Sequence, residues 1–404
     1  MPETFEVSCS KQILDAVQWA VANEQAFEVS GLATKRDYGR PFDSKLNILD
    51  ISGVRGIDLY EPDELVMSAA AATPMNEILD ALNENKQQLS FEPPNLGPLF
   101  GSGVCAGSIG GIFACNLAGP RRLTVGGARD HILGFHAISG RGEIFKSGGR
   151  VVKNVTGFDL SKLLAGSFGT LGVISDVTFK VMPKPEKSWT VLVMTKNSIS
   201  GIQALTSALQ SSCEVTGAAH LPSDIAVKSK VPLVAGAHSA LSAIRIEGPG
   251  PSVSYQTGIL RQLLAEFGEI EILHTSDTLS LWSEVGNVDY FVSSGEQIWR
   301  VSVPPAYGAT VAQKILESIG GRVFYDWGGG LLWLAIEARD DGAHREVRNA
   351  LKESGGHATL LRADDNVRSQ VPVFHPQTEA QARISARIKN SFDPKGLLCP
   401  GRMV

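Results

Sequence analysis

The first 90 residues alternate between helical and extended patterns of apolar positions. Over residues 10–24 the apolar side chains recur every three or four positions, which predicts an amphipathic helix. Short strands are predicted at 27–29 and 46–51. Two further runs, 57–60 and 65–71, flank a turn rich in proline and acidic residues, and they predict a hairpin.

A second helix is predicted to begin just after this hairpin. Thr73 is a typical N-cap residue, and Pro74 suits the first helical position. Ile78, Leu79 and Leu82 then form an apolar stripe at helical spacing.

Residues 93–120 break this pattern with an uncharged run that contains seven glycines and four prolines. Its 28 residues are enough to span a membrane, but glycine and proline disfavour any continuous helix. A flexible linker is the weaker alternative, because apolar residues such as Leu99 and Phe113 lie between the glycines. We predict a buried loop whose backbone approaches a ligand closely, since glycine has no side chain to hold it away.

The remaining chain shows two changes of pattern that suggest domain boundaries. Strands predicted at 132–139, 143–146 and 173–181 lead to Pro183-Lys184-Pro185, a stiff extended segment that ends a first domain of residues 1–185. In residues 186–361 strands alternate with helices, which predicts an α+β domain with helices on one face of its sheet. Residues 362–404 form a C-terminal segment with a helix at 380–391. The predicted strands of the second domain are 189–194, 243–247, 299–303 and 331–337, and its helices are 198–210, 253–267 and 308–319.

Composition excludes several classes of function. The chain is 43% apolar and 20% charged with a net charge of −5, so it offers no basic surface for nucleic acid. The N-terminus lacks an export signal and no other apolar run reaches membrane-spanning length, so we expect a cytoplasmic protein without a membrane span. Five scattered cysteines lack a CxxC motif, and eight histidines lack HxH or HExxH, so no metal site is expected.

A candidate phosphate-binding turn follows the strand at 27–29. Residues 30–35 are small and end in a hydroxyl and a cation, so their backbone N–H groups suit an anion-binding nest. A plain connecting turn has the same pattern, so both interpretations stay open for this segment alone. The glycines at 101, 103 and 107 do not form a Rossmann fingerprint, because the last comes one residue late and no continuous strand precedes them.

Four segments taken together resemble a known family. They read VSGLATKRDYG, GSIGGIFACNLAG with GGARDHILG, KNVTGFDLSKLLAGSFGTLGV and DPKGLLCPGR. They are similar to the FAD-binding fold of the vanillyl-alcohol-oxidase type, in its branch of D-2-hydroxy-acid dehydrogenases. Four more motifs resemble the E-subunit family of glycolate oxidases, and they read GPRR, WRVSVP, DWGGGLLWL and GGHATLLRA. The resemblance implies an α+β FAD domain of two subdomains, a cap domain at 186–361, and a C-terminal segment that returns to the FAD domain.

The resemblance also implies which residues hold the FAD. The diphosphate would be wrapped by Ser30, Gly31, Leu32, Ala33, Thr34 and Lys35. The ribityl chain and flavin ring would lie beside Gly107, Ser108, Ile109, Gly110 and Gly111, with Asn116 and Gly119 continuing that wall. The remaining contacts would come from Lys153, Asn154 and Gly157, and, on the adenine side, from Gly172, Val173 and Ile174. The alternative to a flavin contact for Lys153 is an ordinary position on the protein surface. Arg121 and Arg122 either attract a carboxylate, contact a neighbouring subunit or are solvated.

One departure from the family concerns catalysis. Catalytic members carry an HxHxGDGN-like motif in the cap, and nothing in this sequence matches it. Oxidation of a hydroxy acid needs a base for the hydroxyl proton. The best remaining candidates are His357 as the base, Asp326 as a second choice, and Arg300 as a clamp for the substrate carboxylate. For each of the three, a structural role is the alternative.

The resemblance implies a noncovalent FAD in a multi-subunit oxidoreductase. Cys105 is similar to a cysteine that attaches flavin in some relatives, but its spacing to the glycines differs and residues 29–39 contain no histidine for the usual second link. The implied function is the FAD-binding subunit of a glycolate oxidase complex, supporting oxidation of glycolate to glyoxylate. The implied partners are a second flavin subunit and an iron–sulfur subunit, which would also account for any membrane association. Within the complex, an electron-transfer or scaffolding role and a second catalytic site are both open. A stand-alone FAD-dependent oxidoreductase acting on another 2-hydroxy acid or alcohol is the alternative.

Overall fold

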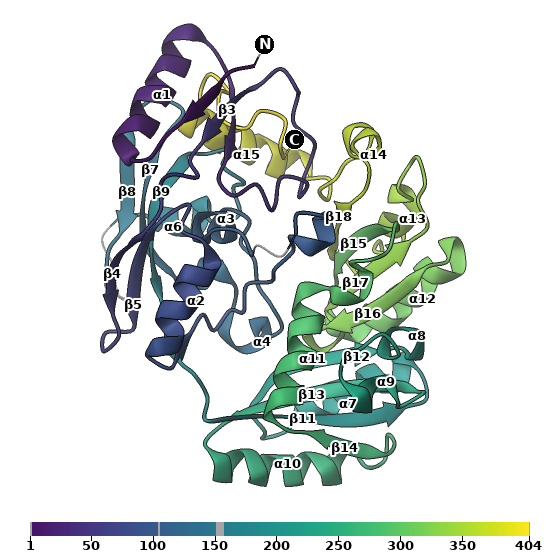
Figure 1. Cartoon of the computed structure of the whole chain (residues 1–404). Coiled ribbons are helices and arrows are strands. Elements are labelled where there is room, and N and C mark those ends of the chain that lie inside the picture. Colours follow the sequence, from purple (N-terminus) through teal and green to yellow (C-terminus); the bar gives the residue numbers. More distant parts are fainter. Residues whose placement is uncertain (1, 104–105, 151–156, 404) are drawn as a thin grey trace. The chain divides into compact units, whose positions relative to one another are not determined.

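The computed structural model describes residues 2–103, 106–150 and 157–403, and these form two compact units (Figure 1). Unit 1 comprises Met1–Ala118, Gly126–Lys184 and Pro376–Val404, and unit 2 comprises Gly119–Val125 and Pro185–His375. The first division lies one residue from the expected boundary at residue 185. The C-terminal segment expected at 362–404 divides instead at Pro376, and the short segment Gly119–Val125 groups with unit 2.

Unit 1 contains a three-stranded and a five-stranded sheet. The first is parallel, in the order β1-β3-β2, and the second is antiparallel, in the order β4-β5-β9-β7-β8. A two-stranded pair joins β6 to β10. The strands are β1 (Thr4–Glu6), β2 (Phe27–Ser30), β3 (Asn47–Asp50), β4 (Ile57–Glu61), β5 (Val66–Ala70), β6 (Gln87–Gln88), β7 (Ile132–Ile138), β8 (Ile144–Gly148), β9 (Val173–Lys180) and β10 (Met182–Pro183).

The helices of unit 1 follow the apolar periodicity of the sequence in most places. The expected helix at 10–24 is α1 (Ser10–Asn23), whose Trp19 packs against Phe5 and Phe27 of the parallel sheet. The other helices are α2 (Met75–Glu84), η1 (Pro98–Phe100), α3 (Ile109–Ala114), α5 (Ala128–His131), α6 (Leu160–Leu164) and α15 (Glu379–Phe392). None of the helices in the described part of the chain is long and apolar enough to cross a membrane.

Two local expectations for unit 1 need correction. Thr73 does not cap α2, because its hydroxyl instead accepts the Gly56 N–H at 2.8 Å and donates to the Ala70 carbonyl at 2.7 Å. The glycine-rich run does contain one short helix, α3. Ser108 caps it by accepting the Gly111 N–H, and buried Ile112 and Phe113 hold it in place, so packing overrides weak propensity.

Unit 2 is built on one eight-stranded sheet in the order β14-β11-β13-β12-β16-β17-β15-β18. Its strands are β11 (Lys187–Thr195), β12 (Val215–Leu221), β13 (Ala240–Gly248), β14 (Ile270–Leu273), β15 (Gln297–Ser302), β16 (Arg322–Asp326), β17 (Leu331–Ile336) and β18 (His357–Arg362). Its helices are α4 (Arg122–Val125), α7 (Ser198–Leu209), α8 (Ser223–Ala226), α9 (Pro232–Ala235), α10 (Gly250–Leu264), α11 (Thr275–Asn287), η2 (Asp289–Phe291), η3 (Pro305–Tyr307), α12 (Gly308–Ile319), η4 (Trp327–Gly329), α13 (His344–Asn349) and α14 (Asp365–Gln370).

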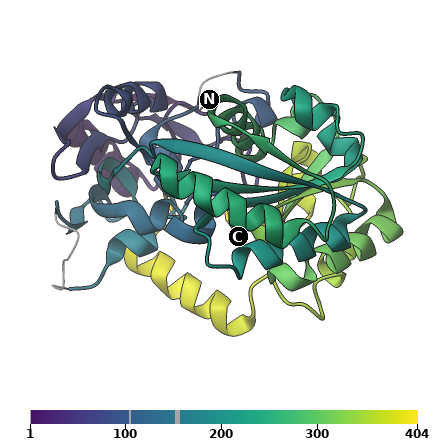
Figure 2. The same cartoon turned by 90° about the horizontal axis from the view of Figure 1, so that it is seen from below.

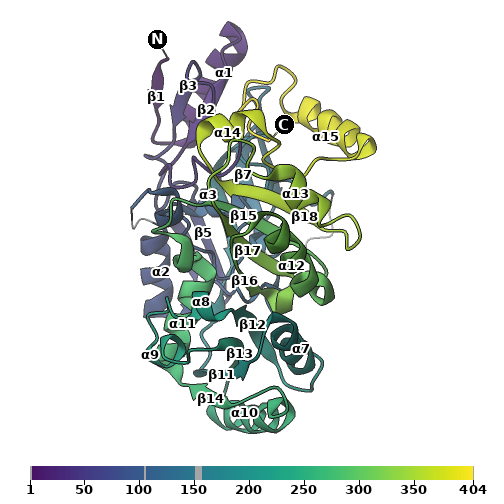
Figure 3. The same ribbon diagram turned by 90° about the vertical axis from the view of Figure 1, so that its right-hand side faces the viewer.

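Helices cover both faces of this sheet, so the expected one-sided covering was wrong. The main core lies between one face and α7, α10, α12 and α13; Figure 2 shows α10 in front of the long strands, and Figure 3 shows these helices together on one side. On the other face α11 packs against β11, where Trp282 Nε1 donates to Thr190 Oγ1 at 2.9 Å. Strands buried on both sides lose the alternation that reveals a face in sequence.

A buried histidine gives unit 2 a predictable sensitivity to acid. His220 on β12 is fully buried, its Nδ1 lies 3.0 Å from Ser242 Oγ, and burial lowers the pKa of His220 to about 3. Because the unfolded chain binds this proton near pH 6.5, stability is complete above that pH and falls as the pH drops from 6.5 toward 3. Between pH 7 and pH 5.5 this histidine should remove about 1.3 kcal/mol of unfolding free energy.

Chemical denaturation at pH 7 and pH 5.5 would test this expectation. The difference between the two pH values should shrink in His220→Asn, which cannot titrate, and the matched control is His238→Asn, which replaces an exposed histidine. An equal pH difference in the wild type and His220→Asn would show that His220 is not the source.

Candidate functional site: a dinucleotide cavity

One cavity in unit 1 gathers most of the residues that the sequence suggested for FAD. Its empty space is about 840 Å³, counting solvent at its open side, and it lies between the turn after β2, the start of α3 and the segment that enters β9. Three segments that are distant in sequence therefore meet here. The suggested residues that line it are Ser30, Gly31, Leu32, Ala33, Thr34, Lys35, Ser108, Gly110, Gly111, Gly172, Val173 and Ile174.

The turn after β2 has the backbone geometry of an anion-binding nest. Ala33 lies in the left-handed region at φ 55°, and the turn continues with hydrogen bonds from Arg36 N to Ala33 O and from Tyr38 N to Lys35 O, both 3.1 Å. A left-handed residue inside a turn makes successive N–H groups converge on one side. The geometry therefore favours the nest over a plain connection.

Glycines at the start of α3 let this turn lie directly on the helix. At Gly107, with φ +78°, an added Cβ would overlap Lys35 Nζ and Thr34 Oγ1. At Gly110 an added Cβ would come within 2.7 Å of the Ala71 Cβ and carbonyl oxygen. The missing side chains thus create the narrow space in which backbone, Thr34 and Lys35 face one cavity.

The charges around the cavity suit a diphosphate. The lining includes one acidic residue, Glu28, and three basic residues, Lys35, Arg36 and Arg402. Glu28 is 3% exposed and accepts two hydrogen bonds from the Arg36 guanidinium, at 2.6 and 2.8 Å. That pair is neutral, so the net charge of the lining is positive. A glycine cradle, a nest and two further cations together fit the FAD dinucleotide.

Two predicted FAD residues lie near this cavity but do not line it. Ile109 is fully buried in the core, and Gly107 packs against the side chains of Thr34 and Lys35. Asn116, farther along, has a structural role, because its Oδ1 accepts the Arg129 N–H at 2.9 Å.

The remaining predicted FAD residues are placed elsewhere or not described. Gly119 belongs to unit 2, where its carbonyl accepts a hydrogen bond from Trp327 Nε1 at 3.1 Å. Gly157 is exposed, with φ 80°. Lys153 and Asn154 fall outside the described residues, as does Cys105.

The cap candidate Arg300 belongs to a cluster of cations in unit 2. Arg300 and Arg122 each place a guanidinium 5.1 Å from the centre of the Trp327 ring, and Arg300 also lies 6.0 Å from the ring of Trp333. His357 lies on the same face of the sheet, because it opposes Ser302, two residues from Arg300 on β15. This polar face lies opposite the main core.

His357 and Asp326 differ in how well they suit acid–base chemistry. His357 is exposed at the start of β18, but partial desolvation by its neighbours and the charges of Arg300, His375 and Arg122 lower its pKa, so its imidazole is neutral near pH 7 and able to accept a proton. Asp326 is 2% exposed, and its carboxylate accepts the Trp327 N–H at 2.7 Å. Asp326 therefore positions Trp327, whereas His357 remains the better candidate for a base.

Sequence reasoning missed several residues that line the cavity. They are Glu28, Val29, Arg36, Phe42, Ile51, Ala71, Ala114, Cys115, Phe168, Gly169 and Arg402. Cys115 is half-buried at the cavity wall, and desolvation raises the pKa of its thiol despite the opposing charges of Lys35 and Arg402. The available signal was the set of four family segments, which contain Val29, Arg36, Ala114, Cys115, Phe168, Gly169 and Arg402.

Comparisons with known proteins agree with this site. Residues 4–148 match the family model described as an FAD binding domain. The chain is 33% identical to the glycolate oxidase subunit GlcE of Escherichia coli (strain K12) over 402 residues, which cover 98% of both proteins. The glycolate oxidase subunit GlcD of Bacillus subtilis (strain 168) is 33% identical over 127 residues, or 31% of this chain and 26% of that protein.

Solved structures show the same fold at low sequence identity. A structure of p-cresol methylhydroxylase with substrate bound matches with a TM-score of 0.71 and 14% identity, over 99% of this chain and 88% of that one. A structure of alkyldihydroxyacetonephosphate synthase matches with a TM-score of 0.70 and 13% identity, over 98% of this chain and 76% of that one. The expected α+β fold of the vanillyl-alcohol-oxidase type is thereby confirmed.

The FAD-binding match and the cavity agree on the cofactor, and the similarity to GlcE extends over nearly the whole of both proteins. This chain is an FAD-binding protein and belongs to the GlcE family of glycolate oxidase subunits.

Proposed function

We propose that this chain is the FAD-binding subunit of a glycolate oxidase complex that converts glycolate to glyoxylate. The full-length similarity to GlcE carries the proposal. When bound, FAD supplies the two-electron redox chemistry. The chain's own part is to bind and orient the dinucleotide with the 30–35 turn and the start of α3. We expect noncovalent attachment, because residues 29–39 contain no histidine for a covalent link and the raised pKa of the half-buried Cys115 thiol makes it a poor nucleophile.

Two partner subunits complete the proposed complex. GlcD carries the name of another glycolate oxidase subunit, which supports a second flavin subunit as one partner. The family resemblance of the sequence supports an iron–sulfur subunit as the other partner. In this arrangement the chain works on the cytoplasmic side and is held at a membrane through its partners.

The test is to purify the chain alone and with its partners, and to record flavin spectra. We expect a flavin spectrum from the chain alone, with the yellow colour in the supernatant after acid precipitation. Anaerobic glycolate should bleach the assembled complex. Bleaching of the isolated chain by glycolate, or by another 2-hydroxy acid, would support the stand-alone oxidoreductase instead. Folded protein that binds no flavin would contradict both functions.

A second candidate function, a substrate site within the cap, is favoured by the cation cluster around Trp327. Arg300 lies on the polar face of the sheet beside Trp333, and Arg122 lies on the same Trp327 ring. A planar guanidinium suits a carboxylate, which every 2-hydroxy acid carries. In this role Arg300 donates hydrogen bonds to the substrate carboxylate, and a ring nitrogen of neutral His357 accepts the hydroxyl proton.

Replacing Arg300 with methionine tests this second role. We expect kcat/KM for glycolate in the assembled complex to fall by about 10- to 100-fold, the usual effect of losing charge-assisted hydrogen bonds. FAD content should not change, because the dinucleotide cavity lies in unit 1. The matched control is Arg339→Met, an arginine of unit 2 that is 41% exposed and pairs with Asp341. Unchanged kinetics in Arg300→Met would leave the chain with its FAD-binding role alone.

A further inference from the structure

The C-terminal segment runs beside β2, the strand that leads into the 30–35 turn. Phe27 N donates to Leu397 O at 2.8 Å, and Cys399 N donates to Phe27 O at 2.9 Å, so residues 397–399 extend the pairing of β2. Asp393, which is 1% exposed, accepts the N–H groups of Leu397 and Leu398 at 2.9 and 2.8 Å. The segment is therefore fixed before it reaches Arg402.

The side chain of Arg402 lies within the loop that follows the 30–35 turn. Its Nη1 donates to Arg40 O at 2.6 Å, and its Nη2 donates to Lys35 O at 3.0 Å and to Arg36 O at 2.7 Å. The guanidinium also stacks 4.4 Å from the centre of the Phe42 ring, and the residue is only 4% exposed.

These contacts add side-chain support to the loop, whose own backbone supplies a hydrogen bond from Tyr38 N to Lys35 O. Carbonyl groups that point away from water need donors, and a guanidinium offers five N–H groups in a rigid fork. One side chain thus joins three carbonyls spread over residues 35–40. A lysine in its place would offer a flexible point charge and lose the fixed geometry.

Arg402 also lines the cavity next to Lys35 and contributes to its positive charge. The charges of both residues act on the half-buried Cys115 thiol, where each opposes the effect of desolvation on the pKa. The same guanidinium therefore connects the loop's carbonyls with the space that the dinucleotide needs.

We propose that Arg402 is a positioning residue for the FAD. By joining the carbonyls of Lys35, Arg36 and Arg40, it fixes the loop that presents Thr34 and Lys35 to the diphosphate. FAD affinity thus depends on a side chain more than 360 residues away in sequence from the turn that it supports.

The test compares Arg402→Gln and Arg402→Lys with Arg383→Gln, an arginine of the same C-terminal segment whose side chain is 72% exposed. FAD is titrated into apoprotein and the Kd is read from the change in flavin fluorescence. We expect the Kd to rise about tenfold or more in Arg402→Gln and less in Arg402→Lys, and to stay as in the wild type in Arg383→Gln.

Hydrogen exchange of the peptide covering residues 33–43 provides a second readout that does not depend on activity. Exchange should become faster in both Arg402 variants and remain unchanged in Arg383→Gln. If Arg402→Gln does not fold, the Arg402→Lys variant carries the test. A wild-type Kd in Arg402→Lys would overturn the proposal, and so would a raised Kd without faster exchange in this loop.

Discussion

Replacing Gly31 with aspartate is expected to weaken FAD binding by at least about 100-fold, because it places a carboxylate in a cavity suited to a diphosphate. Gly31 lines the cavity between Ser30 and the rest of the turn. An added Cβ there meets only ordinary contacts, 3.5 Å from Ser108 Oγ and 3.9 Å from Ile51 Cγ1. The backbone and the space therefore tolerate a side chain, and its charge becomes the decisive change.

The matched control is Gly31→Asn, which has nearly the same shape as aspartate and no charge. We expect Gly31→Asn to bind FAD several times more weakly than the wild type, from crowding alone, and Gly31→Asp to bind far more weakly still. The Kd is measured by titrating apoprotein with FAD, and circular dichroism confirms that each variant is folded. Equal affinities for the two variants would mean that the diphosphate does not lie at this turn.

The sequence identifies most of the segments that line the unit 1 cavity because their key features are local. The helical period of residues 10–24, the small residues of the 30–35 turn and the glycines before α3 each depend on neighbours in the chain. Glycine at positions 107 and 110 has one main physical use, to let backbone approach closely, so its presence there indicates the cavity directly. Such features need no knowledge of distant contacts.

Several features that the sequence does not reveal depend on partners far along the chain. The sequence leaves three roles open for Arg121, because its partner Glu247 lies 126 residues away. Thr190 and Arg245 are polar in sequence but buried beneath Trp282, so the second covered face of the unit 2 sheet was missed. Solvent exposure cannot be read from residue type where a polar group is buried with its hydrogen-bond partners.

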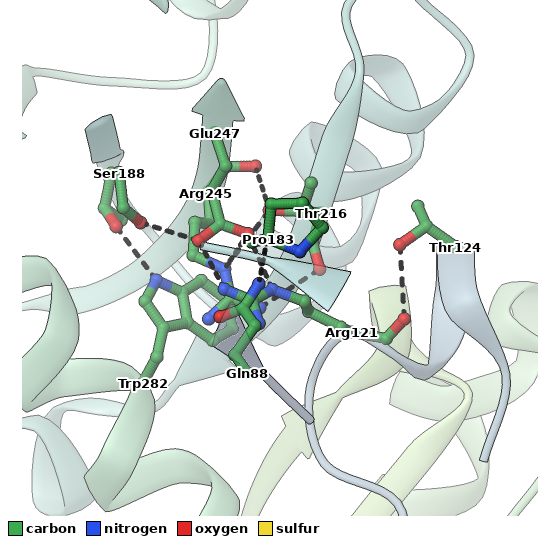
Figure 4. A network of polar contacts seen from close by, with 10 residues as sticks. Gln88, Arg121, Thr124, Pro183, Ser188, Thr216, Arg245, Glu247 and Trp282 are labelled. Atoms are coloured by element: carbon green, nitrogen blue, oxygen red, sulfur yellow. Dashed lines mark hydrogen bonds and ion pairs between the residues drawn. The ribbon is translucent and has the colours of Figure 1, made fainter. Parts of the chain in front are cut away.

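Glu247 lies at the centre of a buried network of charged and polar side chains in unit 2 (Figure 4). Glu247 accepts hydrogen bonds from Arg121 Nε and Nη2 at 2.8 and 2.7 Å and from Ser188 Oγ at 3.0 Å. Arg245 Nε lies 3.4 Å from the same carboxylate, and its guanidinium stacks 4.7 Å from the centre of the Trp282 ring. Burial alone would raise the pKa of Glu247, but the charges of Arg245 and Arg121 outweigh this effect and lower the pKa to about 2.

Arg121 belongs to Gly119–Val125, the short segment that groups with unit 2. Its bidentate pair with Glu247 and the Trp327 hydrogen bond to the Gly119 carbonyl both hold this segment to the cap. The segment follows directly on residues 108–118, whose first part lines the FAD cavity. A buried ion pair in the cap therefore fixes the end of the chain segment that leaves the cofactor site.

Replacing Glu247 with glutamine is expected to lower the unfolding free energy by about 3–5 kcal/mol, because two arginines remain buried without their carboxylate. The ionised carboxylate stabilises the fold above its unfolded pKa near 4.5, and this contribution is lost as the pH falls from 4.5 toward 2, so the loss in the variant should be complete at pH 7. Denaturation at pH 7 measures this loss, and trypsin should cleave after Arg121 or Arg122 faster than in the wild type.

The control is Asp289→Asn, which breaks the exposed pair with Lys230 and should cost less than about 1 kcal/mol of unfolding free energy. In the double variant Arg121→Met/Glu247→Gln the losses should not add, because removing Arg121 relieves part of the unpaired charge. Additive losses, or a wild-type rate of trypsin cleavage in Glu247→Gln, would show that the pair does not hold the segment.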